Sequence, residues 1–347
     1  GLADKKTQKI AELNKLLKNY PKSNWAEEAQ LEIAQTYLKL DEYTKALSAL
    51  SQFEARFGQS EKMATVVLKR GLIYSNMDEN AKALTTYKGV VQNYPGSQEA
   101  IEAIGLAEIV YKRDNNIEDY LDWVATLDFV DFEKSELDST AYNAAFDLYA
   151  QSQWDKALNS FNGYLKRFEN GIFKLNAHYY AAQSAQQINN TQAFFNNYLA
   201  IAEMPSNNYT GQALLAVADY YYQAENMAQA KLWYNKLLLF TNKANIKLQA
   251  QQGIMETSMA LGAYSDAALQ AQRILNSATN DEDLRKRAQL IEAQAYYKNQ
   301  EYAKALQAYQ KLTNTSAGED LAESYYYTAL LLAKQEQYEA SNNQINT

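Results

Sequence analysis

The sequence predicts an all-α solenoid built from antiparallel helix pairs. Small residues and tyrosines recur at intervals of 36 to 38 positions along the chain, and a fixed period in this range is typical of repeat architectures. The composition favours helix throughout, because only three prolines and twelve glycines occur in 347 residues. All three prolines also fall at one place in the period, where they mark the end of a helix.

One column of mostly small residues defines the repeat. Its members are Lys9, Ala46, Ala83, Tyr120, Ala157, Ala193, Ala230, Ala267, Ala305 and Ser341. Twelve positions earlier, a second column is also small in most repeats, as at Ala34, Gly71 and Ala145. Because side-chain size sets the distance between packed helices, these two columns predict that the helices of each pair cross closely.

Each repeat reads as two amphipathic helices joined by a turn. In residues 26–58, Leu31, Ala34 and Leu38 follow helical spacing, and a second apolar stripe begins at Tyr43 after a short acidic break. The three prolines, Pro21, Pro95 and Pro205, each follow an aligned residue by twelve positions. Since proline cannot continue a helix interior, each one predicts the end of a second helix.

This pattern resembles the tetratricopeptide repeat family, whose repeat has small, aromatic, alanine and proline positions. The best match runs through Gly71, Tyr74, Ala83, Tyr87 and Pro95. The resemblance implies a right-handed superhelix of helix pairs that binds partners on its concave surface. The family repeat has about 34 residues, and the repeat here is about three residues longer. The additional residues fall between the proline and the next first helix.

The junctions at Tyr20-Pro21-Lys22-Ser23 and Tyr94-Pro95-Gly96-Ser97 are similar to those of bacterial cell-envelope members of this family. That similarity implies a location in the periplasm or cell envelope, with the cytoplasm as the alternative. Serine is a preferred helix N-cap, so Ser23 and Ser97 are predicted to cap the helices that follow.

The repeat boundaries predict one continuous solenoid with an incomplete repeat at each end. Residues 1–21 are expected to form a second helix only, residues 22–138 repeats that end in a degenerate acidic unit, residues 139–320 further repeats, and residues 321–347 an incomplete C-terminal repeat. We therefore expect eight complete pairs in a segment of a longer array.

The unit around Tyr120 departs from the pattern. Glu108 replaces its small residue and Asp131 its terminal aromatic residue, and nine carboxylates lie between Asp114 and Asp138. The sequence predicts a solvated, poorly packed joint here. A calcium site is the alternative, but a calcium loop needs a central glycine where this segment has Phe129 and Phe132.

Composition excludes several classes of function. The chain has no cysteine and one histidine, His178, and it contains no glycine-rich phosphate loop, so we expect no metal site, no cofactor and no catalytic residue. The formal net charge of −8 disfavours nucleic acid, which requires a basic surface. No apolar run is long enough to insert into a membrane.

The family resemblance assigns the first helix of each pair to the concave surface. The residues that it places in this groove are Tyr142, Phe146, Tyr149, Tyr179, Asp219, Tyr222, Leu290, Gln294, Tyr297 and Tyr326. A one-residue deletion near Tyr179 shifts its phase. If these rings are exposed, they suit an extended peptide or protein segment, and we expect a non-catalytic interaction scaffold. A glycan-binding module is the alternative, and the rings could instead pack between helices.

Overall fold

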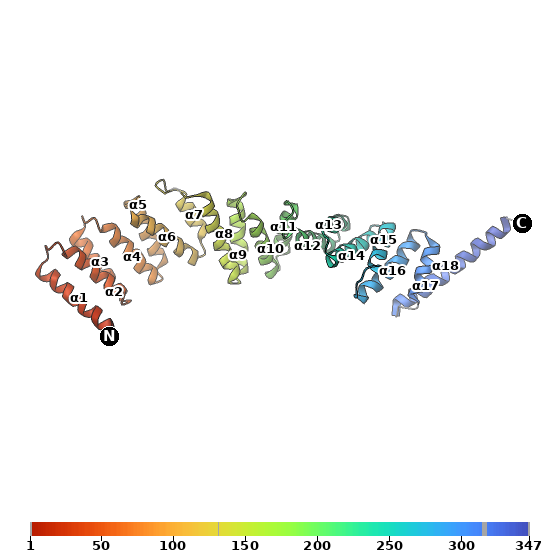
Figure 1. The fold of residues 1–347 in the computed structure, drawn as a ribbon, viewed down its shortest axis with the longest axis horizontal. Coiled ribbons are helices and arrows are strands. Elements are labelled where there is room, and N and C mark those ends of the chain that lie inside the picture. Colours follow the sequence, from red (N-terminus) through yellow and green to blue (C-terminus); the bar gives the residue numbers. More distant parts are fainter. Residues whose placement is uncertain (1, 131, 314–317, 346–347) are drawn as a thin grey trace. The chain divides into compact units, whose positions relative to one another are not determined.

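The computed structural model describes residues 2–130, 132–313 and 318–345, and in this part of the chain all regular secondary structure is helical. The predicted all-α solenoid is thereby confirmed. The chain divides into two compact units after Lys174, and each unit is a succession of antiparallel helices in chain order (Figure 1).

The first unit contains α1 (Leu2–Asn19), α2 (Ala26–Leu38), α3 (Tyr43–Phe57), α4 (Met63–Asn76), α5 (Asn80–Asn93), α6 (Gln98–Arg113), α7 (Ile117–Val124), α8 (Lys134–Ala150) and α9 (Trp154–Arg167). The second contains α10 (Lys174–Gln187), α11 (Thr191–Glu203), α12 (Thr210–Gln223), α13 (Met227–Phe240), α14 (Ala244–Ala260), α15 (Tyr264–Leu275), α16 (Glu282–Lys298), α17 (Tyr302–Leu312) and α18 (Gly318–Ile345).

Eight helix pairs, α2/α3 to α16/α17, carry the repeat. In each pair a single residue with positive φ closes the turn between the two helices, as an αL residue commonly does at a helix end. These residues are Asp41, Asp78, Asn115, Ser152, Asn189, Glu225, Gly262 and Gln300. In seven of the eight turns this residue precedes the aligned residue by five positions.

The turn at Asn189 corrects the alignment of the fifth pair. Five positions beyond it stands Phe194, and the buried residues Asn197, Tyr198 and Ile201 follow Phe194 at the usual helical offsets. Phe194, and not the adjacent Ala193, therefore occupies the repeat column. The short interval lies after this pair, so Tyr179 stands in the same first-helix column as Tyr142.

The proline assignments agree with the structure. Helices α1, α5 and α11 end at Asn19, Asn93 and Glu203, and in each case proline follows two positions later. Ser97 is confirmed as an N-cap, because its Oγ accepts the backbone N–H of Ala100 at 3.0 Å. The N-cap assignment of Ser23 is wrong: its Oγ accepts from the N–H of Trp25, in a turn that precedes α2.

Glycines on one helix lie against large rings on an adjacent helix. Gly71 on α4 lies against the fully buried ring of Tyr87 on α5, and a Cβ added at Gly71 would stand 2.5 Å from that ring. In the second unit Gly253 on α14 lies in the same way against Tyr234 on α13. These close approaches set the spacing of the helices and require glycine.

The acidic unit is better packed than the sequence predicts. Its two unusual residues interact, because the buried Tyr120 hydroxyl donates to Glu108 at 3.4 Å. Asp138, grouped by sequence with the solvated carboxylates, is instead buried and accepts hydrogen bonds from Tyr164 Oη and the N–H of Ile172. Asp131 lies outside the described residues.

The C-terminal helix differs from the other first helices in length. Helix α18 runs without a turn from Gly318 to Ile345 and passes through the aligned position Ser341. Its segment from Lys334 to Gln337 consists of strong helix formers, so nothing in that segment ends the helix.

We expect Gly71→Ala to lower the free energy of unfolding by about 1–3 kcal/mol, because the added methyl group overpacks the site against the buried Tyr87 ring. Urea unfolding measures this change. Gly89 on α5 is the matched control, since its Cβ position is open to space. Gly89→Ala should stabilise the protein by about 0.5–1 kcal/mol through helix propensity. Equal effects of the two substitutions would contradict the packing constraint at Gly71.

Candidate functional site

The expected groove residues of α8 form a row of rings on that helix. Tyr142 is only 7% exposed and stacks on Phe173, with ring centroids 4.4 Å apart. Phe146 follows it at 6.2 Å and Tyr149 follows Phe146 at 6.0 Å, while Trp154 packs edge-on against Tyr149. The Tyr142 ring therefore packs in the interior, and the half-buried rings of Phe146 and Tyr149 continue from it.

The expected groove residues of α12 take part in hydrogen bonds within the chain. Asp219 accepts from Tyr234 Oη at 2.6 Å, and Tyr222 Oη donates to Glu256 at 2.8 Å. Burial raises the pKa of Asp219, although its bond from Tyr234 acts in the opposite direction. The pKa of Tyr222 is raised by its bond to Glu256 and by burial.

Tyr179 on α10 stacks face to face on Tyr209, with centroids 4.0 Å apart. One position before it, the Nδ1 of His178 lies 2.8 Å from Asn197 Oδ1. In the described residues no group of three or more His, Cys, Asp or Glu side chains is placed to hold a metal ion. Across the same residues, every helix is too short or too polar to span a membrane.

A further three expected residues, Gln294, Tyr297 and Tyr326, line one cavity of about 570 Å³ in the second unit. We call it the α16/α18 pocket. Its other main walls are Met259, Lys298, Tyr309, Glu319, Glu323 and Tyr327, which come from α14, α16, α17 and α18. Tyr326 is 64% exposed, so this part of the predicted surface is open to solvent.

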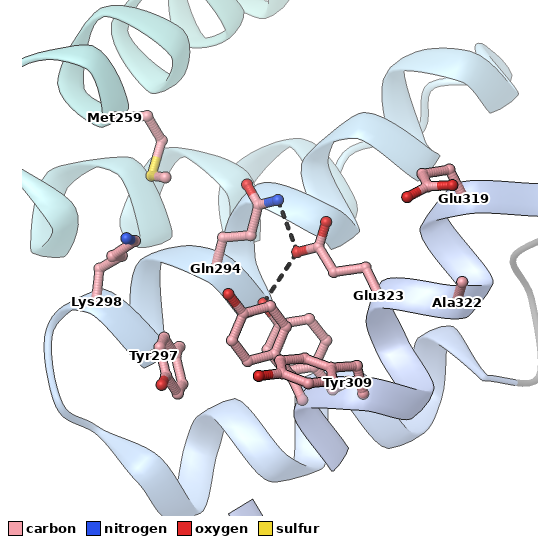
Figure 2. A pocket seen from close by; sticks show the side chains of 10 residues that line it. Met259, Gln294, Tyr297, Lys298, Tyr309, Glu319, Ala322 and Glu323 are labelled. Atoms are coloured by element: carbon pink, nitrogen blue, oxygen red, sulfur yellow. Dashed lines mark hydrogen bonds between the residues drawn. The ribbon is translucent and has the colours of Figure 1, made fainter. Parts of the chain in front are cut away.

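A carboxylate lies at the centre of the pocket. Oε1 of Glu323 accepts from Gln294 Nε2 at 2.9 Å and from Tyr309 Oη at 3.2 Å. Figure 2 shows Gln294 and Glu323 directed toward each other, with Lys298 and Glu319 on opposite sides of this pair. Burial and then the charge of Glu323 raise the pKa of Tyr309 and of Tyr327.

The aromatic rings of the pocket pack against one another. Tyr327 stacks on Tyr309 with centroids 5.1 Å apart, and it packs at a tilt against Tyr297 at 4.7 Å. Tyr326 meets Tyr327 edge-on at 5.2 Å. These contacts restrict the orientations that the rings can adopt.

Sequence reasoning missed Tyr309 and Glu323. A signal for the first was present, since tyrosine recurs four positions after the aligned residue at Tyr87, Tyr198, Tyr234 and Tyr309. The hydroxyls of the last three form hydrogen bonds with polar residues of neighbouring helices. Tyr198 accepts from Gln183 and Gln212. Tyr234 donates to Asp219, and Tyr309 donates to Glu323. Glu323 carries no comparable periodic signal.

Comparison with known proteins finds two family models. One, described as outer membrane lipoprotein (YfiO), matches residues 3–104, and the other, a tetratricopeptide repeat, matches residues 287–316. The outer membrane protein assembly factor BamD of Neisseria meningitidis serogroup B is 29% identical over an alignment of 102 residues, and the match covers 24% of this chain and 38% of that protein. The match thus spans less than two-fifths of the relative's length.

Two solved structures are among those to which the chain is similar. The C-terminal part of a repeat protein from Cytophaga hutchinsonii is 12% identical, with 85% of this chain and 98% of that chain covered and a TM-score of 0.40. The type IV pilus biogenesis factor PilW is 11% identical, with 87% and 99% covered and a TM-score of 0.32.

Asp219→Asn should stabilise the protein at neutral pH and lose this advantage in acid. Folding raises the pKa of Asp219, so the native state holds the proton more tightly than the unfolded chain, and an ionised Asp219 costs stability. Asparagine keeps an acceptor for Tyr234 and removes the charge. The gain should be complete above the raised pKa and should vanish as pH falls below the ordinary value of about 3.8.

The measurement is thermal unfolding between pH 3 and pH 8, with Asp147→Asn as the control because Asp147 is exposed on α8. A destabilised Asp219→Asn at neutral pH, or a gain that does not change with pH, would contradict the burial of this charge.

Proposed function

We propose that the chain is a non-catalytic scaffold of the bacterial cell envelope, built from tetratricopeptide repeats and similar to envelope assembly factors. In this proposal, an extended segment of a protein partner binds on the surface formed by the first helices of the repeats. The matches to an outer membrane lipoprotein family and to BamD support the location and the interaction role.

The observation that carries the proposal is the convergence of Gln294, Tyr297 and Tyr326 on the α16/α18 pocket. These residues come from two successive first helices, and the family resemblance assigned all three to the binding surface. The tyrosines supply rigid contact area with a polar end. Gln294 and Glu323 supply the amide and carboxylate groups that a peptide main chain can bond to.

The ring geometry favours a peptide over a glycan. Stacking on a sugar needs open planar ring faces at regular spacing, whereas Tyr326 and Tyr327 meet edge-on and Tyr297 leans on Tyr327. The amide of Gln294 lies beside these rings, which is the arrangement expected for an extended peptide.

Tyr326→Ala should weaken partner binding by about 1–2 kcal/mol, the range for an interface aromatic residue. Because Tyr326 is 64% exposed, the melting temperature should stay unchanged. Photo-crosslinking in a bacterial envelope extract identifies the partner, and calorimetry with the purified partner gives the affinity.

Tyr325→Ala is the matched control, since the neighbouring Tyr325 is 59% exposed and does not line the pocket. Tyr142→Ala is the opposite control and should cost about 3 kcal/mol or more of stability, because its ring is buried. If Tyr325→Ala and Tyr326→Ala reduce binding equally, or if only soluble glycans bind, the peptide-binding proposal fails.

A further inference from the structure

The α16/α18 pocket carries an excess of negative charge. Among the described residues that line it, the carboxylates Glu319 and Glu323 face a single cation, Lys298. The side chains of Glu319 and Lys298 are exposed, and no ion pair joins Lys298 to either carboxylate in the described structure. The pocket thus attracts positive charge, and Lys298 at its edge opposes that attraction.

The central carboxylate has one oxygen available to a ligand. Both hydrogen bonds to Glu323, from Gln294 and from Tyr309, end on Oε1. Within the described residues Oε2 has no hydrogen-bond partner, and it is not among the buried unpaired atoms. A carboxylate fixed through one oxygen and open at the other is ready to accept a charge-assisted hydrogen bond.

Tyrosine rings stand around this carboxylate. Tyr297, Tyr326 and Tyr327 line the same cavity, and their mutual contacts hold them in a fixed arrangement. A long basic side chain can lay its apolar stem along such rings while its charged end reaches a polar group.

We propose that the α16/α18 pocket binds an arginine or lysine side chain of the partner segment, with Glu323 Oε2 accepting its N–H donors and the tyrosine rings covering its apolar stem. This inference rests on the proposed function, because it requires a peptide in the groove. It adds the chemistry of the partner: a basic residue at the position that reaches α16 and α18. The cavity of about 570 Å³ has room for either side chain.

The test selects binders from a random dodecapeptide phage library with the full chain and then measures the affinity of the selected peptides by calorimetry. We expect the peptides to be enriched in arginine or lysine at one position. Replacing that arginine with citrulline, or that lysine with acetyl-lysine, should weaken binding to the wild type about tenfold, as loss of a charge-assisted pair does.

The protein variants test the assignment to Glu323. Glu323→Gln keeps an oxygen that accepts from Gln294 and Tyr309, so its melting temperature should match that of the wild type. Its affinity for the basic peptide should fall about tenfold, and the citrulline or acetyl-lysine peptide should then bind both proteins equally. Lys298→Gln should tighten binding by about twofold, since it removes a like charge.

Glu282→Gln is the matched control, because Glu282 is an exposed carboxylate on α16 away from the pocket, and it should leave the affinity unchanged. Selected peptides without basic enrichment, or equal effects of Glu323→Gln and Glu282→Gln, would overturn this inference. The scaffold function would still stand in that case if peptide binding depends on Tyr326. If no peptide is selected at all, the proposed function fails and this inference fails with it.

Discussion

The close crossing of neighbouring helices is the constraint on which the rest of this structure depends. Gly71 and Gly253 give the rings of Tyr87 and Tyr234 the space that any Cβ would fill. Four positions after the aligned residue, the hydroxyl of Tyr234 on α13 reaches Asp219 on α12, and that of Tyr309 on α17 reaches Glu323 on α18.

The helix pairs were predictable because their signals are periodic and local. Pro21, Pro95 and Pro205 mark helix ends, since proline acts on its own backbone whatever surrounds it. The register at Phe194 was not predictable in the same way. Alanine and phenylalanine stand side by side there, and the left-handed turn at Asn189 together with the buried residues that follow shows that Phe194 belongs to the column. Ser23 was predicted to be the N-cap of the following helix, but two further residues form a turn before α2 begins.

The binding surface was only partly predictable, because exposure depends on segments that do not repeat. Tyr142 and Tyr326 were assigned to the same groove, yet Tyr142 is buried and Tyr326 is 64% exposed. Phe173, which lies between α9 and α10, covers the Tyr142 ring. No period describes such a connector. Glu323 was not predicted for a similar reason. Its place in the pocket depends on its hydrogen bonds with Gln294 and Tyr309, which the spacing of residues in the sequence does not reveal.

The succession of antiparallel helices has a consequence for the order in which the chain can fold. In each unit, the main packing partners of a helix lie one or two helices away along the chain. A segment therefore needs only the next helix or two to bury its apolar face, and no long loop has to close first. A chain that emerges gradually, from a ribosome or through a narrow channel, can add its pairs one after another, and each finished pair offers the next a formed surface to pack against.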